Sequence, residues 1–102
     1  MHSKVGTSSL GHTSSFDSMF MEQILCPLPL GAKLLSVHLE DNNIWLNFLY
    51  DNDEKEYMDK EFAVLSPFGA LPDNDLFGWR FVGTVVQEAG NPHAWHVFVR
   101  VV

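Results

Sequence analysis

The groups best suited to a binding role in this sequence are carboxylates concentrated in one short segment. The chain has 102 residues, with Asp+Glu 13 against Lys+Arg 6 and a formal net charge of −7 at pH 7. Neighbouring carboxylates repel one another, and a basic partner would turn that repulsion into attraction that speeds association. The predicted acidic surface consists of Asp51, Asp53, Glu54, Glu56, Asp59, Glu61, Asp73 and Asp75. The same negative excess disfavours nucleic acid and anionic membranes as partners.

Metal chemistry is not predicted from these residues. An EF-hand loop beginning at Asp51 would need Gly at its sixth position and Glu at its twelfth, where this chain has Glu56 and Phe62. His93 and His96 are three positions apart, so on a strand their rings point to opposite faces and cannot share an ion. We therefore expect neither a metal nor a cofactor.

Catalytic motifs are also missing from the sequence. No G-x-S-x-G, phosphate-binding loop, dinucleotide-binding or C-x-x-C pattern occurs. Cys26 lies in an apolar stretch without a neighbouring cation, which predicts a packed rather than a reactive thiol. Ser36, His96 and Asp41 make a triad only on paper, and a chain this short leaves little wall for a sugar cleft between paired carboxylates. We predict that the protein is not an enzyme.

A second candidate site is aromatic. Trp79, Arg80, Trp95 and His96 are an alternative ligand pocket, in which rings and one guanidinium would hold a small nucleotide-like molecule. The competing interpretation is packing, because rings in alternating strands usually face a core. On that basis Trp95 and Phe81 are predicted to be core residues.

Alternating apolar residues indicate the strands that must position these groups. The predicted strands run from after Phe16 to Pro27 and across residues 33–39, 44–50, 57–66, 79–87 and 93–101, the last one central in its sheet. Asp41-Asn42-Asn43 predicts a hairpin turn between the second and third strands, and residues 69–78 predict a loop. A short helix across residues 54–60 is the alternative to a polar turn. Gly83 predicts a bulge or a close backbone approach.

The first fifteen residues differ in composition from the rest of the chain. They are rich in Ser, Thr and Gly, with Val5 and Leu10 as apolar anchors, and they lack the apolar run of a secretion signal. We predict a flexible tail over residues 1–15 and a single β domain over residues 16–102. About six strands with short loops and no convincing helix predict an all-β fold, a compact antiparallel sandwich or barrel-like sheet.

Four short motifs resemble one known family. PLGAKLLSV (29–37), GALPD (69–73), FVGTV (81–85) and WHVF (95–98), in this order and spacing, resemble small uncharacterised proteins encoded by bacteriophages and prophages. The resemblance covers residues 27–102, and the chain departs from the family pattern at residues 67–70, in the acidic segment and in the tail. It implies a phage accessory protein in the bacterial host cytoplasm and says nothing about catalytic residues.

The charge and the resemblance together predict a function. We expect a non-enzymatic anti-defence protein that inhibits a host protein, such as a CRISPR or other nucleic-acid-binding protein, by covering its basic surface with the acidic one. Two alternatives are a nucleotide-sequestering module and a minor virion or assembly component. We expect no direct nucleic-acid partner and no membrane, since no apolar run approaches the ~20 residues of a membrane span. A homodimer would stabilise so small a domain.

Overall fold

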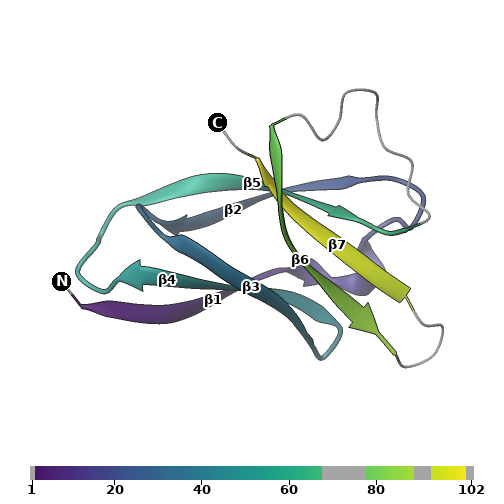
Figure 1. Ribbon diagram of the computed structural model, residues 1–102, viewed down its shortest axis with the longest axis horizontal. Coiled ribbons are helices and arrows are strands. Elements are labelled where there is room, and N and C mark those ends of the chain that lie inside the picture. Colours follow the sequence, from purple (N-terminus) through teal and green to yellow (C-terminus); the bar gives the residue numbers. More distant parts are fainter. Residues whose placement is uncertain (1, 68–77, 89–92, 101–102) are drawn as a thin grey trace.

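Two antiparallel sheets stacked on each other make up the protein in a computed structural model that describes residues 2–67, 78–88 and 93–100 (Figure 1). The strands are β1 (Ser3–His12), β2 (Glu22–Pro29), β3 (Lys33–Glu40), β4 (Asn43–Asp51), β5 (Tyr57–Leu65), β6 (Trp79–Gln87) and β7 (His93–Arg100). The strand order is β1-β4-β3 in one sheet and β2-β5-β7-β6 in the other. The predicted all-β antiparallel sandwich is confirmed, and β7 lies inside its sheet as expected.

Alternate residues of each strand face the space between the sheets and form the core. Successive side chains on a strand point to opposite faces, and every second residue is buried along residues 44–48 of β4 and residues 95–99 of β7. The buried core includes Leu28, Ile44, Leu46, Phe48, Phe62, Val64, Trp95, Val97 and Val99. Burying each large apolar side chain contributes about 1.5–3 kcal/mol to stability. Trp95 is a core residue, as predicted.

The β3–β4 hairpin follows the predicted pattern. Asp41 (φ 54°) and Asn42 (φ 61°) form its two-residue turn, in the left-handed region that Asp and Asn tolerate best after glycine. The predicted polar turn followed by a strand after residue 57 is also confirmed, since β5 begins at Tyr57 and no helix covers residues 54–60. Among the described residues, no helix is long and apolar enough to cross a membrane.

Residues 3–12 form strand β1, which corrects the predicted flexible tail over residues 1–15. The strand pairs with β4 from Ser3 opposite Asp51 to His12 opposite Asn43, and the ladder is made by backbone groups that any residue type carries. Leu10 is only 5% exposed and belongs to the core. The domain therefore begins in the N-terminal segment rather than at residue 16, and the described residues form seven strands where six were predicted.

Strand β2 contains the two prolines that were predicted to end it. It runs from Glu22 to Pro29 at the edge of its sheet, where Pro27 lies opposite Asp59 and Pro29 opposite Tyr57. On an edge strand every second N–H points away from the neighbouring strand. Two prolines spaced by two residues can thus be accommodated without removing ladder bonds, and they make this edge a poor template for another strand.

A β-bulge in β6 lets this strand approach β3 of the other sheet. The register with β7 shifts between Phe81, which is opposite Phe98, and Gly83, which is opposite Val97. A Cβ atom on Gly83 would lie 2.9 Å from Val37 Cγ2, so only glycine fits without a rearrangement. Both the bulge and the close approach predicted from Gly83 are present.

The bulge also reverses which residues of β6 face inward. On the N-terminal side of the bulge, Arg80 is opposite the buried Val99, whereas Phe81 is opposite Phe98 on the outer face. Phe81 is 56% exposed and packs edge-on against Phe98 with 5.6 Å between ring centroids. The prediction of Phe81 as a core residue is wrong. The extra residue breaks the two-residue alternation of the strand, so Phe81 does not face the same side as Gly83. The predicted loop over residues 69–78 lies outside the described residues, except for Gly78.

Replacing Leu10 by Ala should test whether β1 belongs to the folded unit. We expect a loss of about 2–4 kcal/mol in the free energy of unfolding, because the buried side chain leaves a cavity. Val5→Ala is the matched control in the same strand, 65% exposed, and should change stability by less than about 0.5 kcal/mol. Urea denaturation measures both. Equal, small losses in the two variants would show that β1 is not docked on the core.

Gly83→Ala should destabilise the protein by about 1–3 kcal/mol, because the added methyl group has no space beside Val37. In a Val37→Ala background the same substitution should cost less than about 0.5 kcal/mol, since the clash is removed. Thermal and urea unfolding of the four proteins give this coupling. A Gly83→Ala cost that is unchanged by Val37→Ala would contradict the close packing of β3 and β6.

Candidate functional site

Two of the predicted acidic residues shape the turn between β4 and β5. The backbone N–H of Asp53 donates to Asp51 Oδ1 at 2.9 Å. The backbone N–H groups of Lys55 and Glu56 donate to Glu54 Oε2 at 3.1 and 3.4 Å. The Asp51 and Glu54 carboxylates therefore stabilise the turn that carries the rest of the acidic segment.

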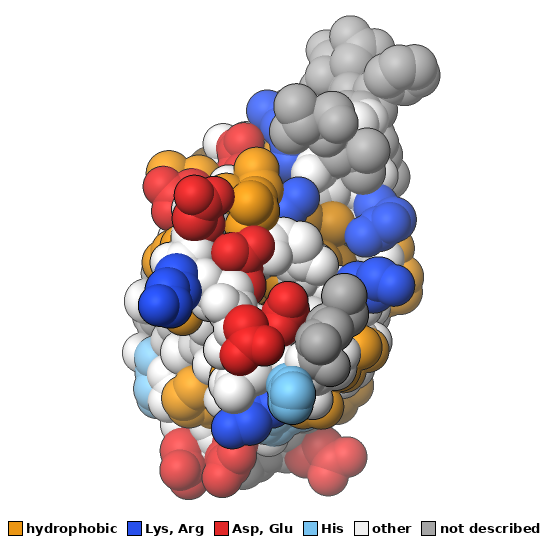
Figure 2. Space-filling model, turned by 90° about the vertical axis from the view of Figure 1, so that its left-hand side faces the viewer, with side chains coloured by type: hydrophobic (Ala, Val, Ile, Leu, Met, Phe, Trp, Pro, Cys, Tyr) orange, Lys and Arg blue, Asp and Glu red, His pale blue; other side chains and the backbone are white. Residues whose placement is uncertain are grey.

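Three other predicted acidic residues are exposed and available to a partner. Asp53, Glu56 and Asp59 are exposed, and none of them has an ion pair within 4 Å to a described cation. We call these three residues the acidic rim. Figure 2 views the end of the molecule that carries the β4–β5 turn and shows Asp and Glu side chains on it.

Of the remaining predicted acidic residues, only Glu61 is among the described residues, and it does not extend the rim. Glu61 is paired with Arg100, with 3.4 Å between Glu61 Oε2 and Arg100 Nε. Asp73 and Asp75 lie outside the described residues. The six described carboxylates of the predicted surface are thus divided among a turn, an ion pair and the acidic rim.

A groove of about 230 Å³ lies beside the acidic rim, between the edge strands β1 and β2. We call it the aromatic groove. Its lining comprises Gly6, Thr7, Ser8, Pro27, Pro29, Phe48, Tyr50 and Tyr57. Asp59 adjoins this lining, because it lies opposite Pro27 on the neighbouring strand, and Glu56 directly precedes Tyr57 in the sequence. Sequence reasoning missed the groove because its residues come from four strands, although the placement of Asp51 and Glu56 next to Tyr50 and Tyr57 was a local signal.

The predicted pocket of Trp79, Arg80, Trp95 and His96 is not assembled. Trp95 faces the core, whereas its neighbour His96 is on the outer face of β7, where its Nδ1 lies 2.8 Å from Thr84 Oγ1. Adjacent residues of a strand point to opposite faces, so these two cannot line one pocket. Trp79 carries the Arg100 guanidinium over its ring at 4.7 Å, and Arg80 lines a different cavity with Val99.

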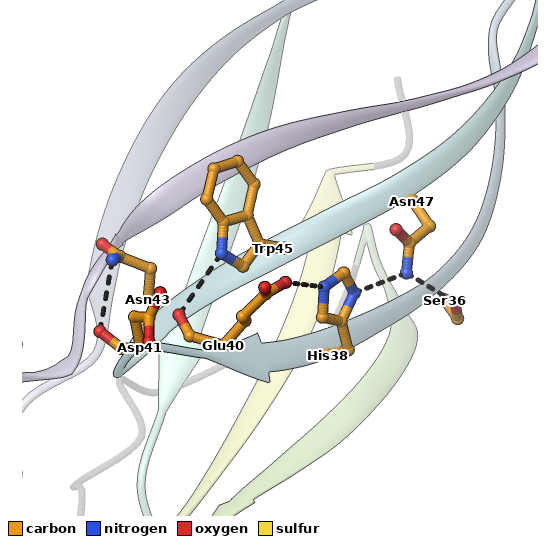
Figure 3. A network of polar contacts seen from close by, with 7 residues as sticks. All are labelled: Ser36, His38, Glu40, Asp41, Asn43, Trp45 and Asn47. Atoms are coloured by element: carbon orange, nitrogen blue, oxygen red, sulfur yellow. Dashed lines mark hydrogen bonds and ion pairs between the residues drawn. The ribbon is translucent and has the colours of Figure 1, made fainter.

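A polar network covers the outer face of the β3–β4 hairpin (Figure 3). Asn47 Nδ2 lies 3.0 Å from Ser36 Oγ and 2.9 Å from His38 Nδ1, and His38 Nε2 lies 3.6 Å from Glu40 Oε2. An amide nitrogen can only donate, so His38 Nδ1 accepts and the ring proton sits on Nε2, facing Glu40. Both ring nitrogens are engaged, and neither can take the proton of Ser36.

The other groups considered for catalysis are similarly placed in structural roles. Ser36 and His96 lie on the outer faces of different sheets, and Asp41 is in the hairpin turn. Cys26 is buried in the core as predicted, and burial raises the pKa of its thiol, which disfavours the reactive thiolate. Within the described ranges, no three His, Cys, Asp or Glu side chains are arranged to hold a metal ion.

The chain matches no family model, no curated protein and no solved structure. The resemblance to phage proteins therefore stays a prediction.

Asp51→Ala should lower the free energy of unfolding by about 0.5–1.5 kcal/mol, because the substitution removes the acceptor that organises the β4–β5 turn. Asp53→Ala makes the same change in net charge at an exposed carboxylate of the acidic rim, and it should change stability by less than about 0.5 kcal/mol. Chemical denaturation at neutral pH compares the two. Equal losses would mean that Asp53 also has a structural role.

Proposed function

We propose that the protein is a non-enzymatic binding protein that holds a Lys- or Arg-bearing segment of a partner protein at the aromatic groove. The observation that carries this proposal is the continuity of the groove with the acidic rim. Tyr57 and Pro27 line the groove, Asp59 lies opposite Pro27 on the neighbouring strand, and Glu56 directly precedes Tyr57 in the sequence. Apolar contact and negative charge are thus offered side by side.

Lys and Arg side chains have the chemistry that such a surface accommodates. Their apolar stems pack against aromatic rings while the charged heads reach carboxylates. Tyrosine supplies a large contact area with little loss of side-chain entropy, and Tyr57 is 64% exposed. The groove is small, so it accepts a side chain or a short extended segment rather than a folded domain.

The identity of the partner follows from the predicted setting of the protein. Surfaces that bind nucleic acid are rich in Lys and Arg, so a host nucleic-acid-binding protein would present several suitable side chains. A phage protein that covers such a surface would inhibit its host target in the cytoplasm without touching nucleic acid. The alternative of a nucleotide-sequestering module loses the pocket on which it was based, since Trp95 and His96 face opposite sides of β7.

The proposal predicts that charge reversal in the acidic rim abolishes capture of the partner. Wild-type protein and the Asp53→Lys/Glu56→Lys variant are immobilised, incubated with bacterial lysate and compared by quantitative mass spectrometry. A protein retained by the wild type should bind the variant at least about tenfold more weakly by calorimetry. Tyr57→Ala should weaken binding as well, because it removes a wall of the groove.

The matched control is Glu40→Lys/Glu88→Lys, which makes the same change in net charge at two exposed positions outside the rim. It should retain the partner, and binding of the wild type should weaken as salt concentration rises. If the control loses the partner to the same extent, the effect is one of overall charge. If neither variant loses it and salt has no influence, the acidic rim is only a solvated surface and the proposal fails.

A further inference from the structure

Four of the six Lys and Arg residues of this acidic chain line one cavity of about 440 Å³. They are Lys33, Lys60, Arg80 and Arg100, and the other lining residues are Ala32, Leu34 and Val99. Lys33 comes from β3, whereas Lys60, Arg80 and Arg100 come from β5, β6 and β7 of the other sheet. Figure 2 shows Lys and Arg side chains gathered towards the upper right of this face, beside the Asp and Glu side chains.

Two of these cations occupy positions that face the space between the sheets. Lys60 is opposite the buried Cys26 on β2, and Arg80 is opposite the buried Val99 on β7. Other inward positions on these strands hold apolar side chains such as Phe62 and Val97. Inward positions of a sandwich are normally apolar, so the half-buried Lys60 requires water or a counter-ion, whereas Arg80 stays exposed to solvent.

The cavity supplies almost no negative charge of its own. Among the described residues, the one ion pair made by these four cations joins Arg100 to Glu61. Lys33, Lys60 and Arg80 have no carboxylate within 4 Å in the described part of the chain, and no acidic residue lines the cavity. Bringing like charges together raises the free energy of the empty cavity, and a bound anion reverses the sign of that contribution.

We infer that this cavity binds a compact ligand through a polyphosphate group. Guanidinium groups bind phosphate in a bidentate manner and lysines add point charges, so two Arg and two Lys match a group with several negative oxygens. The volume lies within the range of small-molecule sites. Among the described residues no aromatic side chain lines the cavity, and the ring of Trp79 is covered by Arg100. Recognition therefore depends on the phosphates rather than on stacking of a base.

Arg100 is held in place before the ligand arrives. Its guanidinium lies over the Trp79 ring at 4.7 Å, and its Nε is 3.4 Å from Glu61 Oε2. A guanidinium carries five N–H donors, so an ion pair through Nε leaves the terminal Nη groups for a phosphate. A change in the position of Arg100 alters the surroundings of the Trp79 indole, which makes tryptophan fluorescence a direct reporter.

The test is a titration of the full chain with inorganic tripolyphosphate, followed by calorimetry and tryptophan fluorescence. We expect one ligand per chain and a rise in the melting temperature that chloride at equal ionic strength does not produce. The Lys60→Gln/Arg80→Gln variant should bind at least about tenfold more weakly, because both inward-facing cations are lost. The matched control is Lys4→Gln/Lys55→Gln, which removes two exposed cations outside the cavity and should stay within about twofold of the wild type.

Lys33→Gln keeps the test valid if the inward-facing variant does not fold, since Lys33 is exposed and its loss should weaken binding without unfolding the chain. ATP is the second arm: tighter binding of ATP than of tripolyphosphate assigns the site to nucleotides, and equal binding assigns it to the phosphate chain alone. The inference is overturned if tripolyphosphate does not bind, if the control variant loses as much affinity as Lys60→Gln/Arg80→Gln, or if a single-stranded oligonucleotide binds more tightly than either. It is independent of the aromatic groove, because none of these probes requires a partner protein.

Discussion

The extra residue in β6 at Val82–Gly83 is a constraint on two features of the sandwich. It sets how closely β6 packs on β3, and it sets which side chains of β6 face inward. It brings the strand close enough to β3 for Gly83 to contact Val37, which holds the two sheets together along one side. The same insertion moves Phe81 to the outer face and turns Arg80 towards the space between the sheets. Without it, the regular alternation of β6 would place a phenylalanine in the core and leave the basic cavity without one of its inward-facing cations.

The strands that carry strong apolar alternation could be predicted from the sequence, including the β3–β4 hairpin, β5 and the central β7. Strand β1 could not, because its Ser, Thr and Gly residues give no hydrophobic pattern and its order comes from backbone pairing with a distant strand. Gly83 predicted the bulge, but the exposure of Phe81 depends on the register, which is visible only once the partner strand is known. The sites follow the same division. The acidic segment is local in sequence, whereas the aromatic groove and the basic cavity assemble from several strands each.

Charge is segregated rather than balanced across this small protein. The acidic rim carries carboxylates without described ion pairs, while four of the six basic residues converge on one cavity. Opposite charges close together on a surface normally pair, with a gain of up to about 1 kcal/mol for an exposed pair. Among the described residues, only Glu61 and Arg100 do so across this region. The two proposed sites therefore differ in the sign of their charge.

The position of β7 has a consequence for how the chain acquires its structure. This strand lies between β5 and β6, so neither of them can complete its ladder in the larger sheet until residues 93–100 have been inserted. The pairing of β1 with β4 likewise joins residues that are far apart in the sequence. Non-local pairing of this kind slows folding, because the entropy of closing long loops must be lost before the contacts form. Until that insertion, the β5 edge and the apolar face of β6 are open to other chains. A chain that has not yet made this insertion is therefore exposed to aggregation.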